Sequence, residues 1–376
     1  MSFTPTFCPC RSHESFQYQR RGSFVRACDG RRIQRFQCKQ CNRSFSTQTF
    51  SGDYRLKRPE LDEPVFLALI SKLTQRQFAR THTCNRKLVM HRLERFGEQC
   101  RAFHAAQVKA AQASGVQGGL FLLDELETYE HNRRLKPLTV PVLVHKPSHC
   151  VLHTAVGTLP ARRPLKPAEQ EKLAKQESAG GKRRSQSRIK VDECFQVLSR
   201  LVPGTASVVV RTDQKHSYAK LLRERFGERL VHKTTHSKEP RTYSNPLFVV
   251  NHTLAMLRDG LGRLVRRNWG TTKKRERLEQ HLWIWIAWRN YVRPITNHNH
   301  EQTPGMVAGL CQRMLAVADL IALRVFRLAD AQPRGPESGG GGGEGGGRTR
   351  TALRPSDFKS DASAGSATSP RSREPV

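Results

Sequence analysis

The amino-acid sequence predicts an α/β protein with a mixed β-sheet, and three observations lead to this fold class. First, short apolar segments rich in Val and Leu recur along the middle of the chain, as expected for buried strands. Second, segments with helical periodicity follow and then separate the later strands. Third, two of the strands are joined by only four residues, which is typical of a hairpin. The predicted strands are 119–123, 138–145, 150–157, 207–210 and 229–233, and the predicted helices are 191–203, 216–226, 247–268 and 273–291.

Composition divides the chain into four segments. Residues 1–50 are rich in Cys, Arg and Gln and predict a small module like a zinc ribbon. Residues 55–110 are helical in pattern, and residues 118–325 predict the α/β domain. After about residue 331 the sequence consists largely of Gly, Ser, Pro and Arg, so we expect residues 331–376 to be disordered.

The charge of the chain indicates a polyanionic partner. Its 376 residues include 65 Lys and Arg against 32 Asp and Glu, which gives a formal charge of +33. Because basic residues occur in nearly every segment, double-stranded DNA is favoured over a membrane surface. The sequence contains no long apolar run and no apolar core of a signal peptide near its start. We therefore expect a cytoplasmic protein whose ten cysteines are thiols or metal ligands.

A structural zinc site is predicted in the first segment. Cys38 and Cys41 form a C-x-x-C knuckle, which directs two thiolates at one tetrahedral cation. Cys8 and Cys10 are the first choice for the other two ligands, although their C-x-C spacing is one residue short. His13 is the alternative, because Cys10 and His13 have the standard two-residue gap.

Residues 74–95 have the pattern of a helix-turn-helix. A short helix over 74–80 is followed by a turn at 81–84, and Asn85 is placed to cap a second helix over 86–95. In this motif the second helix enters the major groove. We expect contacts to DNA from basic residues of this second helix and from two arginines at the end of the predicted helix 247–268. These residues are Arg86, Lys87, His91, Arg92, Arg266 and Arg267.

Two aspartates are the first candidates for catalysis. Asp124 and Asp213 each end an apolar strand. A carboxylate at such a place is costly unless it is paired or bound to metal, and carboxylates are the ligands that Mg²⁺ and Mn²⁺ prefer. The order of elements is a strand with Asp, two hairpin strands, a helix, a strand with Asp, then helix, strand and helix, which is the order of the ribonuclease H-like fold. That fold takes a third acidic residue from a late helix, where Glu279 and Glu276 are one turn apart.

Several stretches, taken in order, resemble the zinc-ribbon insertion-sequence transposases of the DDE class. They are Phe36–Ser46, Leu123–Thr128, Val210–Asp213, Leu278–Leu282, Asn290–Pro294 and Thr303–Leu310. The resemblance implies that Asp124, Asp213 and a late-helix glutamate bind two Mg²⁺ or Mn²⁺ ions, with Glu279 preferred because it falls just before His281 and Leu282. It further implies cleavage and transfer of DNA strands by a homodimer or higher assembly. The short cysteine spacing and the Gly-rich tail depart from the family pattern.

Three other interpretations stay open at this point. The chain could be a DNA-binding regulator without catalysis, which would require Asp124 and Asp213 to lie far apart. It could also be another ribonuclease H-like nuclease that cuts without joining. Finally, the composition of the tail is compatible with a decayed, inactive transposase.

Overall fold

The structure is a computed structural model that describes residues 3–10, 13, 15–51, 54, 56–111, 119–202, 204–236, 238–265 and 270–323. Within this part, the first elements form a small antiparallel sheet in the order β1-β2-β3 (Tyr18–Val25, Arg32–Cys38 and Ser44–Ser46). A compact cluster of Cys8, Phe36, Cys38 and Phe45 forms its core. Short 3₁₀ turns follow at Thr47–Phe50 and Pro59–Leu61. The predicted tail, 331–376, and the predicted DNA contacts Arg266 and Arg267 lie outside the described residues.

The two helices of the predicted helix-turn-helix are present as α2 (Gln75–Thr81) and α3 (Arg86–Ala111), and a further helix, α1 (Asp62–Ile70), precedes them. Thr74 caps α2, because its Oγ1 accepts from Gln77 N–H while the Gln77 side chain accepts from Thr74 N–H. Asn85 ends the turn and its Oδ1 accepts from Lys87 N–H over 2.8 Å. The second helix is much longer than predicted, since α3 continues to Ala111 and packs along a later helix.

The larger sheet is mixed, with strand order β6-β5-β4-β8-β9 and β7 also pairing with β5. β4 (Leu120–Tyr129), β5 (Pro137–His145) and β6 (Cys150–Thr154) are antiparallel neighbours, while β8 (Val208–Asp213) and β9 (Leu230–Thr235) run parallel to β4. β7 is the two-residue strand Gly157–Thr158. This mixed α/β arrangement is consistent with a ribonuclease H-like core.

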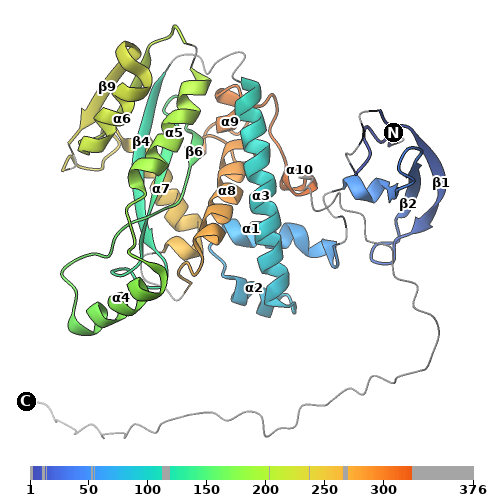
Figure 1. Cartoon of the computed structure of the whole chain (residues 1–376). Helices are drawn as coiled ribbons and strands as arrows, with labels where there is room; N and C mark the ends of the chain where they lie inside the picture. Colours follow the sequence, from blue (N-terminus) through green and yellow to red (C-terminus); the bar gives the residue numbers. More distant parts are fainter. Residues whose placement is uncertain are drawn as a thin grey trace, which may run out of the picture. The chain divides into compact units, whose positions relative to one another are not determined.

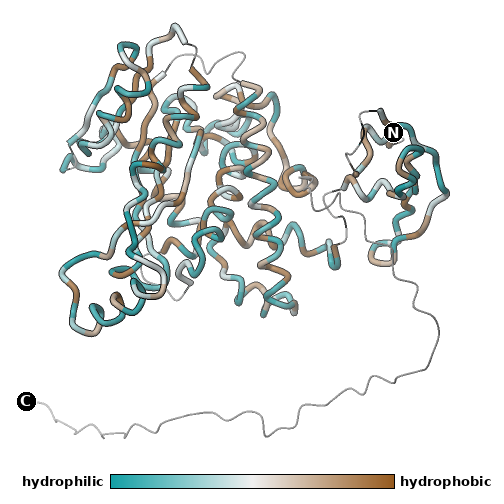
Figure 2. Tube along the Cα trace, viewed as in Figure 1, coloured by the Kyte–Doolittle hydropathy of each residue, from teal (hydrophilic) through white to brown (hydrophobic). Residues whose placement is uncertain are grey.

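Helices cover both faces of this sheet (Figure 1). α5 (Ser187–Leu201) packs on β5 and β6 and against α6 (His216–Phe226), whereas α7 (Phe248–Gly260) packs on β4 and β5 and α8 (Arg275–Tyr291) on β6. α4 (Pro167–Gly180) lies in the charged stretch before α5. Two short helices, α9 (Pro304–Val307) and α10 (Val317–Ala322), end the described chain. The helices alternate between hydrophobic and hydrophilic residues along their length, as amphipathic helices do (Figure 2).

The helix-turn-helix shares one hydrophobic core with the sheet domain. α3 packs along α8, and buried residues from Leu61 to Leu320 belong to a single cluster. The predicted segments 55–110 and 118–325 are therefore continuous in packing, although the boundaries themselves stay predictions. No helix in the described residues is long and apolar enough to cross a membrane.

Candidate active site and nucleic-acid interface

Asp124 and Asp213 lie beside each other on neighbouring parallel strands. The paired residues of β4 and β8 run from Leu120 with Val209 to Leu122 with Arg211, and two further residues along each strand bring Asp124 level with Asp213. Residues level with each other in a parallel pair point to the same face of the sheet. Asp213 is the last residue of β8, as predicted. The prediction that Asp124 ends its strand is wrong, because β4 continues to Tyr129 in a long hairpin with β5.

The electrostatics of Asp124 show that the two carboxylates interact. Burial raises the pKa of Asp124 to about 6, and the negative charge of Asp213 adds to this rise. The backbone N–H of Glu125 donates to Asp124 Oδ1 over 2.7 Å and opposes the rise, as does the positive charge of Arg241. Two acidic groups that repel each other across neighbouring strands favour a cation between them, because a divalent ion would relieve their repulsion.

Glu125 is a part of the site that the sequence reasoning missed. Because side chains alternate along a strand, Glu125 points to the face opposite Asp124, where α5 and α6 lie. Its carboxylate accepts hydrogen bonds from four side chains: Thr139, Ser187, Lys215 and Tyr218. Although burial opposes it, the hydrogen bonds from Lys215, Thr139 and Tyr218 lower the pKa of Glu125 below its usual value. The alternation rule, applied to the acidic residue next to Asp124, could have indicated this position.

The two candidates for the third acidic residue lie on the first turns of α8. Oε1 of Glu279 is 3.4 Å from Nη1 of Arg101 on α3, and the Glu279 side chain is 29% exposed. Glu276 is more exposed and has Arg275 as its neighbour at 3.8 Å. The structure thus brings the two aspartates together and places Glu279 against α3. Which glutamate serves as a ligand stays a prediction.

The first segment holds a cluster of metal-ligand side chains. Ligand atoms of Cys8, His13, Cys38 and Cys41 all lie within 4.8 Å of one another. Nε2 of His13 is 3.3 Å from Sγ of Cys38, and Sγ of Cys8 is 3.6 Å from Sγ of Cys41. Zn–S bonds of about 2.3 Å in a tetrahedron require sulfurs about 3.7 Å apart, so these four residues fit a zinc ion.

Cys10, the predicted fourth ligand, lies beside this cluster. Its Sγ is only 3.1 Å from Sγ of Cys8, which is shorter than two thiolates on one tetrahedral ion require. His13, the predicted alternative, has the better position, because its imidazole approaches Cys38 across the site. Burial acts to raise the pKa of the Cys38 thiol. Hydrogen bonds from the backbone N–H groups of Cys41 and Gln40 act in the opposite direction and outweigh burial, so the pKa of Cys38 lies below its usual value. Cys38 therefore favours the thiolate form, whereas burial raises the pKa of Cys41 above its usual value.

Among the DNA contacts predicted on α3, three side chains are exposed and one, Arg92, is buried. Arg86, Lys87 and His91 are exposed on the first turns of α3. Arg92 as a DNA contact is wrong, because it is 4% exposed and its Nε lies 2.5 Å from Oδ1 of Asp62. Its Nη2 also donates to the Lys57 carbonyl oxygen over 3.0 Å. Helical periodicity explains the difference, since Arg92 shares the inward face with Val89 and Phe96.

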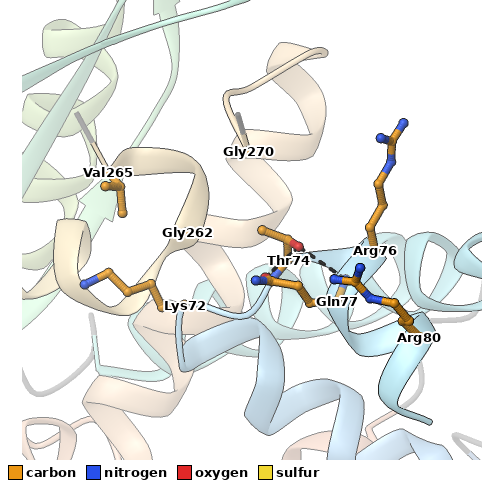
Figure 3. A pocket seen from close by; sticks show the side chains of 8 residues that line it. All are labelled: Lys72, Thr74, Arg76, Gln77, Arg80, Gly262, Val265 and Gly270. Atoms are coloured by element: carbon orange, nitrogen blue, oxygen red, sulfur yellow. Dashed lines mark hydrogen bonds between the residues drawn. The ribbon is translucent and has the colours of Figure 1, made fainter. Parts of the chain in front are cut away.

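A basic cavity of about 780 Å³ lies beside α2 (Figure 3). Arg76 and Arg80 extend from α2, and Lys72 lies on the other side of the cavity. The remaining lining residues are Thr74, Gln77, Gly262, Val265 and Gly270. Lys72 also donates to Asp259 over 2.8 Å. The cavity joins the helix-turn-helix to the segment that follows α7, and its cations suit an anionic ligand.

Comparisons with known proteins add little to this geometry. No protein-family model and no curated protein sequence matches the chain. The solved structures that matched the chain include a pre-cleavage Mos1 transpososome and a Mos1 mariner paired end complex with Mn. The first has 12% sequence identity and covers 73% of this chain and 80% of that chain, and the second has 13% identity and covers 62% and 75%. Both have a TM-score of 0.22, which is too low to support a conclusion about function.

Proposed function

We propose that this chain is a DDE-type DNA transposase with a ribonuclease H-like core, which cleaves and joins DNA strands. The observation that carries the proposal is the Asp124 and Asp213 pair. Both carboxylates sit on one face, where the pairing of two parallel strands ends, and burial together with their repulsion raises the pKa of Asp124. This charge arrangement is typical of a site that binds a divalent cation.

Each part of the site has a task in this reaction. Asp124 and Asp213, with Glu279 or Glu276 as the third carboxylate, would hold two Mg²⁺ or Mn²⁺ ions. These carboxylates would thereby place Lewis-acid chemistry at the scissile phosphate, which would activate a water or a 3′-hydroxyl and stabilise the leaving oxygen. Arg241, whose charge acts on Asp124, is suited to holding the scissile phosphate at the carboxylates.

Binding of the DNA is assigned to three further features. The start of α3 would enter the major groove and contact the DNA through its exposed side chains Arg86, Lys87 and His91. The cations of the cavity, Arg76 and Arg80, would contact the phosphate backbone. The zinc module, held by Cys8, His13, Cys38 and Cys41, would add a basic surface. Joining two element ends requires at least two protomers, so we propose a homodimer or higher assembly on DNA.

The test is strand cleavage of a plasmid that carries the DNA flanking the coding sequence, with Mg²⁺ or Mn²⁺ and without. Wild type and the control Glu224→Gln, an exposed residue of α6, should cleave to equal extents. Asp124→Ala and Asp213→Ala should each lower cleavage at least a hundredfold while binding the DNA as wild type does. Full cleavage by both aspartate variants would contradict the mechanism. Glu279→Gln and Glu276→Gln, assayed side by side, identify the third carboxylate.

One observation favours a second candidate function, a transposase remnant that binds DNA without cleaving it. The carboxylate of Glu279 is paired with Arg101 of α3, so the preferred third ligand is engaged elsewhere. In this case wild type would bind the flanking DNA but release no cleaved strand with either cation. Arg101→Ala would then restore no cleavage, whereas in an active enzyme it frees Glu279 and leaves cleavage intact.

A further inference from the structure

Glu125 and Lys215 form a bridge directly behind the two aspartates. Glu125 follows Asp124 on β4, and Lys215 lies two residues after Asp213, at the start of α6. The Lys215 ammonium donates to Oε1 of Glu125 and, over 2.7 Å, to Oγ of Ser187. The Glu125 side chain is only 9% exposed, so its charge is largely removed from water.

The same two residues also hold the aspartates through their backbones. The N–H of Glu125 donates to Asp124 Oδ1 over 2.7 Å, and the N–H of Lys215 donates to Asp213 Oδ1 over 3.1 Å. Each aspartate therefore accepts a hydrogen bond from the residue whose side chain joins the bridge. The bridge links the two carboxylates through one closed set of contacts.

This bridge lies where the backbone no longer joins the two strands. The paired residues of β4 and β8 end at Leu122 with Arg211, before either aspartate. Beyond that point, the side-chain bond between Glu125 and Lys215 spans the gap. Glu125 is anchored in turn by Tyr218 at 2.5 Å and Ser187 at 2.8 Å, and by Thr139 of β5. A buried charge needs such partners to offset its desolvation. Because apolar side chains would fill the same space without this cost, stability alone does not explain the charged pair.

We infer that Glu125 and Lys215 are positioning residues, which set the separation of Asp124 and Asp213 and thereby the affinity of the site for its divalent cation. The inference rests on the proposed function. In this role both residues act through the aspartates and supply no ligand atom to the ion. They act as the outer partners of metal-binding carboxylates do, whose loss typically weakens metal binding about 10- to 100-fold.

The test is direct Mn²⁺ binding to the full chain by calorimetry, combined with the Mn²⁺ dependence of plasmid cleavage. Glu125→Gln and Lys215→Met should raise the Kd for Mn²⁺ about tenfold or more. Saturating Mn²⁺ should restore most of the cleavage rate, because the aspartates remain. Lys215→Arg should bind nearly as wild type does, since it keeps the charged donor. Glu193→Gln and Lys190→Met remove a comparable Lys–Glu pair of α5, with Nζ and Oε1 2.7 Å apart, and should leave the Kd unchanged.

The outcomes separate this inference from the proposed function. Mn²⁺ binding that is lost in Asp213→Asn but unchanged in Glu125→Gln and Lys215→Met would overturn the positioning role alone. Wild type that binds no Mn²⁺ through Asp124 and Asp213 would overturn both. A thermal unfolding curve of each variant reports a folding defect, and Lys215, 40% exposed, is the variant site least coupled to folding.

Discussion

Asp213 lies level with Asp124 on the neighbouring parallel strand, and its charge helps to raise the pKa of the Asp124 carboxyl. The larger cause is the partial burial of Asp124 at the sheet. Without a cation, the ionised form of Asp124 therefore opposes folding. This cost can be measured separately from any catalytic activity.

Asp124→Asn should stabilise the metal-free protein at neutral and alkaline pH. The folded-state pKa of Asp124, about 6, is above its ordinary value of 3.8. The free energy of unfolding of wild type therefore falls as the pH rises from about 4 to 6, and it remains at this lower value at higher pH. The asparagine variant does not titrate, and at pH 8 we expect it to be more stable by about 1–3 kcal/mol. Urea unfolding in EDTA at pH 8 and pH 4 measures the difference, which should vanish at pH 4. Equal stability at pH 8 would contradict this prediction.

The cluster in the first segment should hold one zinc ion per chain through Cys8, His13, Cys38 and Cys41. His13→Ala and Cys38→Ser should lose the ion and unfold the small sheet, because its few buried side chains cannot hold it together alone. Cys10→Ser should keep the ion, and Cys28→Ser, an exposed cysteine, is the matched control. Zinc content of the purified variants decides between the two arrangements. Loss of zinc in Cys10→Ser with retention in His13→Ala would favour the ligand set first predicted.

Arg92→Leu should destabilise the fold. Any loss of DNA binding in this variant should result from unfolding, because Arg92 is not a DNA contact. Removing Arg92 leaves the Asp62 carboxylate buried with only Arg95, at 3.3 Å, and breaking a buried ion pair costs about 3–5 kcal/mol. The double variant Arg92→Leu with Asp62→Leu should regain much of this stability, because no buried charge is then unpaired. Denaturant unfolding of the single and double variants tests the pair. A single variant as stable as wild type would show that Arg92 is solvated.

Arg86→Gln and Lys87→Gln should weaken DNA binding without changing stability. Both side chains are exposed at the start of α3, where the helix would face the duplex. A cation in the major groove also neutralises nearby phosphates, so removing either charge should lower the slope of log affinity against log salt by up to about 1. Binding to duplex DNA over a salt series measures the slope, and Lys220→Gln, an exposed cation of α6, is the control. Wild-type slopes in both variants would place the DNA elsewhere on the protein.

Local sequence signals predicted much of the secondary structure. α6 has the predicted bounds, and α8 and β9 agree within two residues, because helical and strand periodicities are properties of neighbouring residues. Proline within a strand usually marks an edge or a bulge, yet Pro141 lies in β5, which is an inner strand. Thr154 Oγ1 donates to the Pro141 carbonyl oxygen, so the side of Pro141 that lacks an N–H faces the gap between β6 and β7. A local rule could not indicate that gap, which arises from strands distant in sequence.

The sequence by itself determined the order of strands and helices and the grouping of the cysteines near residue 40 with those near residue 10. It also indicated the two aspartates as candidate metal ligands on two of the strands. Only the tertiary structure decided which side chains meet. It buried Arg92 on Asp62, brought His13 to Cys38, placed Glu279 against Arg101 and joined Glu125 to Lys215. The physical reason is that periodicity within one element specifies which face a residue occupies. The partner on that face is supplied by a distant segment, whose position depends on packing of the whole core.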